Sequence, residues 1–273
     1  MDTRWDPDQY LKYGDERGRP WVELITRVFH PSPRKVVDLG CGPGKTTAML
    51  MDRWRDAYIV GVDSSEEMID RARAMEVPGR LEFRRGDLSD LGWIEGGPFD
   101  VVLCAATFQW IPEHAALFPA IVDALNDGGV FAFQVPANFD QPSHTLLYEL
   151  AGSDRWSSLL AYRVRPDPVL SPSDYLKSLL VTGVAVDVWS TTYLHVLRGP
   201  DAVLEWVRGT ALRPFLSALE EEGTAGDVAE FEASYGAALR AAYPTDGEGR
   251  TIFPFRRIFC VASRGTLFDR SRS

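Results

Sequence analysis

The sequence has few cysteines and no long apolar run. Its three cysteines, Cys41, Cys104 and Cys260, are widely separated, and this spacing fits neither a disulfide framework nor a zinc site. No apolar run approaches the ~18 residues that a membrane-spanning helix needs. The N-terminus also lacks the apolar stretch of a signal peptide. These absences predict a cytoplasmic protein with no bound metal and no membrane partner.

Positive charge is also scarce. Lysine and arginine number 29 against 39 aspartates and glutamates, which gives a net charge of −10. This balance argues against a nucleic-acid binder, because such proteins carry a basic face. The 14 phenylalanines, 9 tyrosines and 8 tryptophans supply enough core material to exclude disorder over most of the chain. We expect a monomer, built either as one large domain or as one domain with an inserted cap.

Residues 34–136 alternate between short apolar runs and helical patterns. This alternation is typical of buried parallel strands joined by helices, and it predicts a doubly wound, mostly parallel α/β sheet. Such sheets bind ligands beyond the carboxyl ends of their strands. The expected strands are 35–40, 57–63, 80–87, 99–106 and 129–136, and the expected helices are 44–55, 66–75 and 114–125.

The rest of the chain predicts a helical cap and one further sheet strand. Residues 137–250 contain helical patterns at 142–152, at 172–182 and over 200–243, with breaks expected at Pro214 and at Gly223–Gly226. Residues 185–197 alternate apolar and polar types, as an added strand does. Residues 251–264 read as the last strand of the sheet. We expect residues 1–33 to form an N-terminal helical segment and 265–273 a frayed tail.

The segment VVDLGCGPGKTT (36–47) carries a glycine-rich loop between a strand and a helix. A phosphate-binding loop is excluded, because the glycine required five residues before Gly44 is Leu39. A dinucleotide fingerprint starting at Gly40 is weakened, since its third glycine falls on Lys45, but it stays open. The third interpretation is a loop preceded by an acid, here Asp38. A carboxylate there opposes a pyrophosphate and favours a cationic ligand such as S-adenosylmethionine.

Two further acids follow the next strands. Asp63 ends the second expected strand, where a carboxylate can accept hydrogen bonds from both hydroxyls of a ribose. Asp87 follows the third strand in RRGDL and is placed to accept a hydrogen bond from an adenine amino group, with Leu88 against the adenine ring. Together with Asp38, these positions predict a nucleoside-containing cofactor.

This series of motifs resembles the class I S-adenosylmethionine-dependent methyltransferases. The resemblance covers about 100 residues, and its motifs include the glycine loop and FDVVLCAATFQWI (99–111). The resemblance implies a Rossmann-like sheet of seven strands with a helical cap, S-adenosylmethionine as methyl donor and S-adenosylhomocysteine as product. Ala105–Phe108 stand where adenine methyltransferases of DNA carry an Asn/Asp-Pro-Pro-aromatic motif, which argues against base methylation. The residues that the resemblance assigns to the cofactor are Asp38, Gly40, Gly42, Gly44, Asp63, Ser64, Asp87, Leu88, Cys104 and Ala105.

Beyond this region the sequence is similar to the trans-aconitate methyltransferases almost from end to end. The shared segments include WDPDQYLKYGDERGRPWVEL (5–24), VWSTTYLHVL (188–197), VLEWVRGTALRPFL (203–216) and FPFRRIFCVASR (253–264). Lys45 replaces an expected asparagine, and residues 151–170 match poorly. The resemblance implies methyl esterification of a carboxylate of a small polycarboxylic acid.

A carboxylate acceptor requires little from the protein except positioning. It is ionised at pH 7 and needs no general base, so no obligatory catalytic residue is expected. Several arginines should converge on the acid. Arg256 and Arg257 point to opposite faces of the last strand, and which of them faces the acceptor is left open. The expected acceptor-binding residues are Tyr10, Arg17, Arg19, Gln109, Trp110, Tyr193, His195, Trp206 and Arg213.

Two other functions stay open at this point. A methyltransferase acting on a phenol or a biosynthetic intermediate would need a base, because a phenol has a pKa near ~10. His195 or His144 would then supply it. A protein of another class, which binds the cofactor without catalysis, is the second alternative.

Overall fold

The computed structural model describes residues 14–165 and 167–267, with side chains from residue 18 onward. These residues form two compact units. The sheet unit comprises residues 17–136, 169–191 and 257–267, and the helical unit comprises residues 14–16, 137–165, 167–168 and 192–256. Within the described residues, no helix is both long and apolar enough to cross a membrane.

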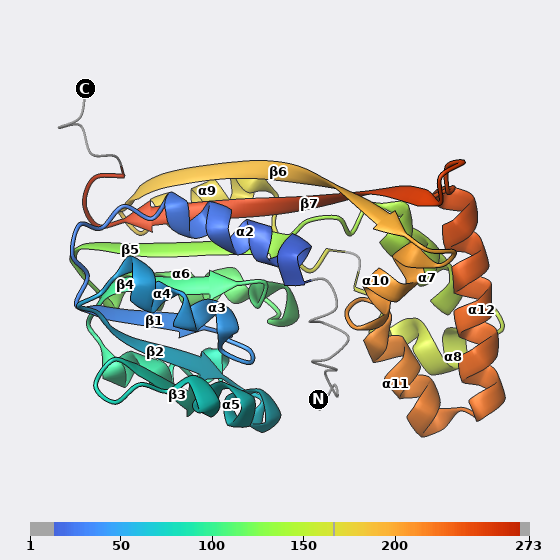
Figure 1. Ribbon diagram of the computed structural model, residues 1–273, viewed down its shortest axis with the longest axis horizontal. Coiled ribbons are helices and arrows are strands. Elements are labelled where there is room, and N and C mark those ends of the chain that lie inside the picture. Colours follow the sequence, from blue (N-terminus) through green and yellow to red (C-terminus); the bar gives the residue numbers. More distant parts are fainter. Residues whose placement is uncertain (1–13, 166, 268–273) are drawn as a thin grey trace. The chain divides into compact units, whose positions relative to one another are not determined.

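Seven strands form one sheet in the order β3-β2-β1-β4-β5-β7-β6 (Figure 1). Strands β1 to β5 pair in parallel, whereas β7 runs antiparallel to β5. The doubly wound, mostly parallel sheet predicted from the sequence is therefore confirmed. The strand bounds are β1 (Lys35–Leu39), β2 (Tyr58–Asp63), β3 (Leu81–Arg85), β4 (Phe99–Ala105), β5 (Leu125–Pro136), β6 (Ala185–Arg198) and β7 (Arg250–Ser263).

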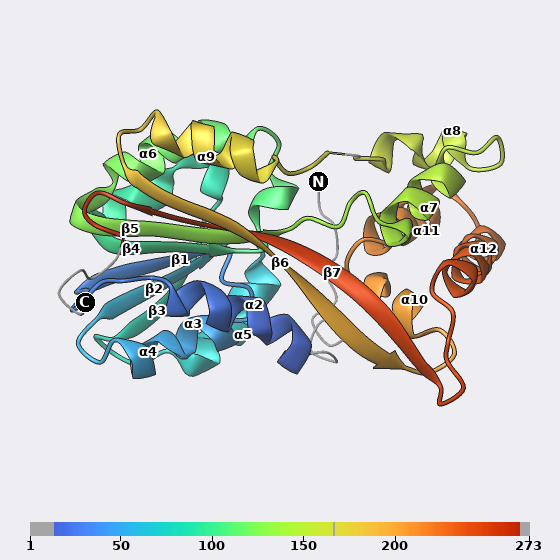
Figure 2. The same cartoon turned by 90° about the horizontal axis from the view of Figure 1, so that it is seen from above.

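Helices cover both faces of the sheet unit. Figure 2 shows α6 and α9 on one side of the strands, and α2, α3, α4 and α5 on the other. On the first side, Phe118 of α6 and Tyr175 of α9 pack against Phe133 of β5. The bounds are α2 (Gly14–Thr26), α3 (Lys45–Ala48), α4 (Leu50–Arg53), α5 (Glu66–Ala72), α6 (Phe118–Asp123) and α9 (Pro172–Leu180).

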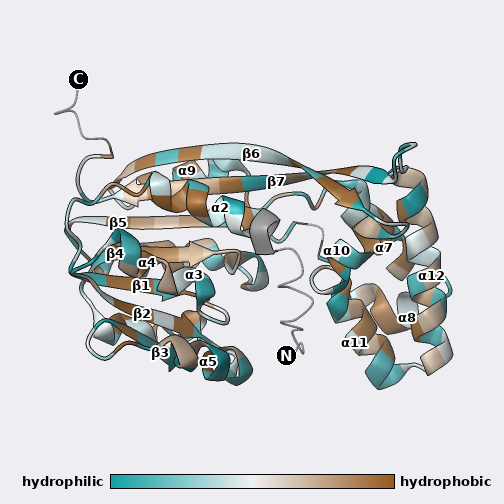
Figure 3. Ribbon diagram, in the orientation of Figure 1, coloured by the Kyte–Doolittle hydropathy of each residue, from teal (hydrophilic) through white to brown (hydrophobic). Residues whose placement is uncertain are grey.

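The central strands are apolar along most of their length, as Figure 3 shows for β1, β4 and β5. Their side chains are buried on both faces, for example Val36 and Val37 of β1 and Val101 and Val102 of β4. Covering both faces with helices requires apolar residues at successive positions rather than at alternate ones. This is why the strands could be recognised as continuous apolar runs.

The short helices differ from the expected ones. Residues 44–55 form two four-residue helices, α3 and α4, in place of one helix. The expected helix over 66–75 ends in a 3₁₀ turn, Arg73–Met75. The expected helix over 114–125 begins with a 3₁₀ turn, His114–Leu117, and continues as α6. Strand β5 begins at Leu125, four residues earlier than expected, because Leu125 already pairs with Phe99. A register shift between Phe99 and Val101 absorbs the glycines before Val130.

The helical unit consists of α7 (Pro142–Ala151), α8 (Ser157–Leu160), α10 (Ala202–Arg208), α11 (Arg213–Glu222) and α12 (Ala225–Ala242). Its core includes Trp156, Phe215, Phe231 and Tyr235. Portions of β6 and β7 also belong to this unit. The expected break at Pro214 is confirmed to within a few residues: α10 ends at Arg208 and α11 begins at Arg213. The proline lies in the first turn of α11, where its missing N–H has no helical partner to lose. The second expected break lies at Gly223 and Thr224, and the capping box of Thr224 and Asp227 begins α12 there.

The fold generates a first prediction, at the contact between α9 and the 3₁₀ turn His114–Leu117 before α6. Tyr175 is fully buried, and its hydroxyl lies 2.7 Å from Nε2 of the buried His114. Tyr175→Phe should lower the free energy of unfolding by about 1–3 kcal/mol, the usual effect of removing a partner from a buried polar group. Urea unfolding measures it. Tyr58→Phe is the control: this hydroxyl bonds the part-exposed Glu82, so the change should stay within about 0.5 kcal/mol. Equal losses in the two variants would contradict the prediction.

Candidate functional site

The glycine loop lies between β1 and α3 and is held by hydrogen bonds to the end of β2. The amides of Gly40 and Cys41 donate to the carbonyl oxygen of Val62 at 2.7 and 3.0 Å. Gly40, Gly42 and Gly44 all have positive φ angles, of 76°, 55° and 79°. This backbone region is costly for residues with a Cβ atom, which explains why the loop is built from glycine.

The three glycines differ in what surrounds them. A Cβ on Gly40 would lie 2.0 Å from Oγ1 of Thr107, and one on Gly44 would lie 2.6 Å from the ring of Phe83. Because glycine has no Cβ atom, the loop can pack closely against Thr107 and Phe83 at these two positions. A Cβ on Gly42 would meet no described residue within 4 Å. Among the residues that the structure describes, the backbone of Gly42 therefore borders open space, where a ligand can approach it.

Asp38 lies near the end of β1 and is almost completely buried. Its Oδ2 accepts a hydrogen bond from the hydroxyl of Thr47 in α3. Burial raises the pKa of Asp38 to about 7, against the opposing effect of the Thr47 hydrogen bond, and the nearby Asp63 adds to the rise. A buried carboxylate with this pKa favours a cation beside it, since a positive charge stabilises its ionised form.

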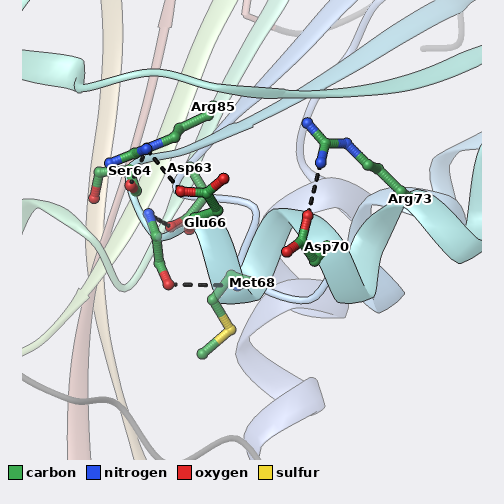
Figure 4. Close-up of polar contacts among 8 residues, drawn as sticks. Asp63, Ser64, Glu66, Met68, Asp70, Arg73 and Arg85 are labelled. Atoms are coloured by element: carbon green, nitrogen blue, oxygen red, sulfur yellow. Dashed lines mark hydrogen bonds and ion pairs between the residues drawn. The ribbon is translucent and has the colours of Figure 1, made fainter.

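Asp63, the last residue of β2, connects the glycine loop with the start of α5, and Figure 4 shows the side toward α5. Its Oδ2 accepts from the amide of Gly42, and its Oδ1 from the amide of Ser65, each at 2.9 Å. Burial raises the pKa of Asp63, whereas these amides lower it. Ser65 then caps α5 by accepting from the amide of Met68. The carboxylate thus fixes the loop and the start of α5 in one arrangement, while each oxygen keeps a second lone pair for a ligand hydroxyl.

The remaining nucleotide positions lie at the ends of β2 and β3. Asp87 begins a 3₁₀ turn, Leu88–Asp90, and its Oδ1 accepts from the amide of Ser89 at 2.8 Å. Leu88 is buried beside it. The carbonyl oxygen of Ser64 accepts from Arg85, which also pairs with Glu66 (Figure 4). Asp87 is therefore a local cap, and its second oxygen retains the capacity to accept from an amino group.

The end of β4 completes this edge of the sheet. Cys104 is fully buried and pairs with Leu39, so its side chain points to the face opposite that of Asp38, and only its backbone can face the loop. Ala105 ends the strand, and Ala106 has a φ angle of 55°. Gln109 lies in the 3₁₀ turn Phe108–Trp110 and is buried. Its Nε2 donates to the carbonyl oxygen of Ala106, while its Oε1 has no partner among the described residues.

Two contributors to this site were not identified from the sequence: Thr47 and Thr107. The Thr47 hydroxyl lies in the first turn of the helix after the loop, a position that a hydrogen-bond partner for Asp38 could have suggested. Thr107 is recognisable only in three dimensions, because its contact with Gly40 joins segments 67 residues apart.

The expected acceptor residues of the sheet unit have different environments. Arg19 is exposed on α2, and the indole of Trp110 is 42% exposed. Arg17 lies in α2, but its side chain lies outside the described residues, as does the whole of Tyr10. Gln109 is the buried member of this group.

In the helical unit three of the expected residues lie together. His195 of β6 lies between the rings of Tyr193 and Trp206, with centroids 6.2 and 4.6 Å away. All three side chains are buried. Arg213 begins α11 and pairs with Glu220 at 3.1 Å. It follows the break between α10, which ends at Arg208, and α11, and its place at the mouth of an acceptor site stays a prediction.

The two neighbouring arginines of β7 are placed differently. Arg256 belongs to the helical unit, where it donates to the carbonyl oxygen of Ala137 and pairs with Asp140 at 2.9 Å. Arg257 belongs to the sheet unit and is buried.

His144, the other base considered, is a buried residue of α7. Burial lowers its pKa to about 4, and its Nδ1 lies 3.2 Å from Oγ of Ser143. It is neutral at pH 7 but a weak base. Among the described residues no group of three or more histidine, cysteine, aspartate or glutamate side chains is arranged to hold a metal ion.

The chemistry of the site fits S-adenosylmethionine. Asp38 provides a buried negative charge for a cationic ligand, and Asp63 provides paired acceptor oxygens for ribose hydroxyls. The open backbone at Gly42 allows the ligand to lie against the loop. These groups meet at the carboxyl ends of β1 and β2, the edge at which doubly wound sheets bind their ligands.

Comparison with known proteins finds a family match over the region that contains the glycine loop. The family described as "Methyltransferase domain" matches residues 36–129. Trans-aconitate 2-methyltransferase of Streptomyces avermitilis is 47% identical over 267 residues, covering 95% of this chain and 97% of that protein. The enzymes of the same name from Streptomyces coelicolor and Rhodococcus jostii are 48% and 46% identical, covering 95% and 94% of this chain and 86% and 98% of their own lengths.

Solved structures share the fold at low sequence identity. A methyltransferase from Thiobacillus denitrificans in complex with S-adenosyl-L-homocysteine aligns with a TM-score of 0.54 at 18% identity, over 91% of each chain. A putative methyltransferase in complex with the Haloferax volcanii Trm112 activator aligns with a TM-score of 0.55 at 19% identity, over 97% of this chain and 95% of that one. At these identities the likeness concerns the fold alone.

Fold, glycine loop and sequence comparison together define an S-adenosylmethionine-dependent methyltransferase of class I. The relatives match almost the whole chain, and this allows a family within the class to be assigned. The chain belongs to the trans-aconitate 2-methyltransferase family.

The loop generates a prediction that separates backbone strain from steric overlap. Gly40 and Gly128 have the same φ angle of 76°, but only Gly40 has a neighbour within 4 Å of an added Cβ. Gly128→Ala should cost about 1–2 kcal/mol of stability from φ strain alone. Gly40→Ala should cost a further ~1–3 kcal/mol because of Thr107, and should weaken binding of S-adenosylhomocysteine. Urea unfolding and calorimetry measure the two effects. Equal stability losses would refute the steric role of Thr107.

Asp38 generates a prediction about pH. Its pKa is raised from 3.8 to about 7 in the folded protein, so folding opposes its ionisation and this group lowers stability as pH rises through that interval. A cationic ligand favours the ionised form. Affinity for S-adenosylmethionine should therefore rise from pH 5 to 7, by up to about tenfold per pH unit, and level off above pH 7. Burial also raises the pKa of Asp63, so its ionisation contributes to the same pH dependence. Asp38→Asn should therefore reduce the slope of affinity against pH rather than abolish it. An unchanged slope in Asp38→Asn, measured by calorimetry, would disprove the role of Asp38.

Proposed function

We propose that this enzyme transfers a methyl group from S-adenosylmethionine to one carboxylate of trans-aconitate, giving a monomethyl ester and S-adenosylhomocysteine. The observation that carries the proposal is the match with eight relatives named trans-aconitate 2-methyltransferase, 43–48% identical over about 95% of this chain. The match includes the part of the chain outside the cofactor-binding region, where an acceptor would be recognised.

The reaction needs no proton transfer. S-Adenosylmethionine supplies an electrophilic methyl group. A carboxylate oxygen forms the new bond to that methyl carbon, the methyl–sulfur bond breaks, and the bonding electrons remain on sulfur. Because the acceptor is ionised at pH 7 and the product ester is neutral at that group, no base is required.

The protein's part is therefore alignment and exclusion of water. Asp63 and the glycine loop hold the ribose end of the donor in place, and Asp38 places a negative charge near its cationic part. Positioning alone can supply about 7–11 kcal/mol of the barrier reduction. The residues assigned to the donor are Asp38, Gly40, Gly42, Gly44, Asp63, Ser64, Asp87, Leu88 and Ala105, with the backbone of Cys104.

The acceptor assignments extend this proposal. The helical unit supplies the aromatic group of Tyr193, His195 and Trp206, in which a histidine and a phenol can donate hydrogen bonds to a carboxylate. We retain as acceptor-binding candidates Tyr10, Arg17, Arg19, Gln109, Trp110, Tyr193, His195, Trp206 and Arg213. Residues 137–250 would then act as a substrate cap and residues 1–33 as a segment over the cofactor. We further propose that the enzyme is cytoplasmic and monomeric.

The proposal predicts which acceptors are used and which residue is dispensable. Transfer of a tritiated methyl group should give base-labile, volatile label with trans-aconitate and none with a phenol such as catechol. His144→Gln should keep kcat/KM for trans-aconitate within about threefold, because a base contributes nothing to this step and a base contribution is typically 10²–10⁴-fold. Citrate, isocitrate and cis-aconitate are the companion acceptors, and a reaction without acceptor is the blank.

Other outcomes would identify the alternatives. Phenol methylation that is lost in His144→Gln or His195→Gln would replace the proposal by a base-dependent methyltransferase. Binding of S-adenosylhomocysteine, with no turnover of any acid or phenol, would indicate a protein that binds the cofactor without catalysis.

A further inference from the structure

The turn after β4 is fixed against the start of the glycine loop. Strand β4 pairs with β1 up to Leu39, so its last residue, Ala105, reaches the level of Gly40 in the loop. Two residues later, Thr107 contacts Gly40, because a Cβ atom on this glycine would lie 2.0 Å from the Oγ1 atom of Thr107. Ala106, between these two residues, therefore lies beside the loop that borders the donor.

Ala106 has an unusual backbone conformation that its neighbours maintain. Its φ angle is 55°, in the left-handed region that is unfavourable for a residue with a Cβ atom. Its amide donates to the carbonyl oxygen of Gln134 at 2.8 Å, and its carbonyl oxygen accepts from Nε2 of Gln109. The side-chain amide of Gln109 is thereby held at the carboxyl end of β4, the edge at which doubly wound sheets bind their ligands.

The hydrogen bond to Ala106 determines which atom of the Gln109 amide is left for a ligand. A carbonyl oxygen needs a donor, so the NH₂ group must face Ala106 and Oε1 must point elsewhere. Gln109 is 7% exposed, and its Oε1 has no hydrogen-bond partner among the described residues. A buried acceptor atom without a partner is unfavourable unless a ligand supplies the missing donor. This position therefore requires an N–H or O–H group from a ligand.

The acid that receives the methyl group does not supply such a hydrogen. Its carboxylates are ionised at pH 7, and an ionised carboxylate only accepts hydrogen bonds. The hydrogen must then come from S-adenosylmethionine, which carries N–H or O–H groups at its adenine amino group, its ribose hydroxyls and its α-ammonium group.

The strand order separates these three groups. Asp63 at the end of β2 and Asp87 after β3 are the expected partners of the ribose hydroxyls and the adenine amino group. In the order β3-β2-β1-β4 they lie two and three strands away from β4, which is about 10 and about 14 Å at the usual strand spacing. The α-ammonium group is at the opposite end of the donor from adenine, so it is the group that reaches the end of β4.

We infer that Oε1 of Gln109 accepts a hydrogen bond from the α-ammonium group of S-adenosylmethionine. This inference rests on the placement of the donor in the proposed function, and it moves Gln109 from the acceptor candidates to the donor site. Asp38 contributes negative charge near the cationic part of the donor, and Gln109 contributes a hydrogen bond with a defined direction. Holding the amino-acid end of the donor limits rotation about its bonds to sulfur and so directs the methyl group.

Two variants isolate the oxygen of Gln109. Gln109→Met removes this oxygen, whereas Gln109→Glu keeps an oxygen there and adds a negative charge. Both variants lose the NH₂ group that donates to Ala106, so damage to the turn is common to both and does not affect their comparison. Calorimetry measures the affinity of each variant for S-adenosylhomocysteine and for an analogue that lacks only the amino group.

Gln109→Glu should bind S-adenosylhomocysteine roughly tenfold or more tightly than Gln109→Met does, as expected for a hydrogen bond to a charged group. The analogue without the amino group should bind Gln109→Glu no more tightly than Gln109→Met. Removal of the amino group should also weaken binding to wild-type protein roughly tenfold more than binding to Gln109→Met.

Three results would overturn the inference. Equal affinities of the two variants for S-adenosylhomocysteine would mean that Gln109 only holds the turn. Wild-type affinity of Gln109→Met for S-adenosylhomocysteine, with a raised KM for trans-aconitate, would return Gln109 to the acceptor. Where Gln109→Met does not fold, Gln109→Glu decides alone: it should discriminate against the analogue at least as strongly as wild-type protein, and weaker discrimination would refute the assignment.

Failure of the proposed function gives a different result. Wild-type protein that transfers no methyl group to trans-aconitate would overturn the proposed function. The two variants would still decide the role of Gln109, because binding of S-adenosylhomocysteine does not involve the acceptor.

Discussion

The site depends on one carboxylate that accepts two backbone hydrogen bonds. Asp63 binds the amide of Gly42 with one oxygen and the amide of Ser65 with the other. One amide belongs to the glycine loop after β1, and the other begins the turn into α5. The parallel pairing of β1 with β2 brings these segments to the same edge. Without an acceptor at position 63, both amides would lose their partner, and the loop that borders the donor would lose its anchor.

Burial of acidic groups at this edge is costly unless a positive ligand joins them. Burial, together with the nearby Asp63, raises the pKa of Asp38 to about 7. The hydroxyl of Thr47 offsets only part of this effect. A protein stabilised for its own sake would replace such a carboxylate by an apolar residue, as buried charges are weak contributors to stability. Their presence is explained by a ligand that carries charge of the opposite sign.

Sequence reasoning located the elements that periodicity and local chemistry determine. Buried parallel strands appear as continuous apolar runs, and the loop was found because positive φ angles require glycine at fixed spacing. Contacts between distant segments were not accessible in this way. The contact of Thr107 with Gly40, the pairing of Arg213 with Glu220, and the difference between Arg256 and Arg257 all depend on strand register and packing. Pro214 did mark the break between α10 and α11, because proline is excluded from a helix interior but is accommodated in a first turn.

A protein with a net charge of −10 repels a polycarboxylate at long range, so recognition of such an acid must be local. Exposed arginines paired with acids contribute little to that, because their charge is already compensated and is screened by salt. A buried arginine acts at short range in a medium of lower dielectric constant, where one cation has a larger effect. An acidic protein that binds such an acid therefore needs a cation within hydrogen-bond distance of it and shielded from salt.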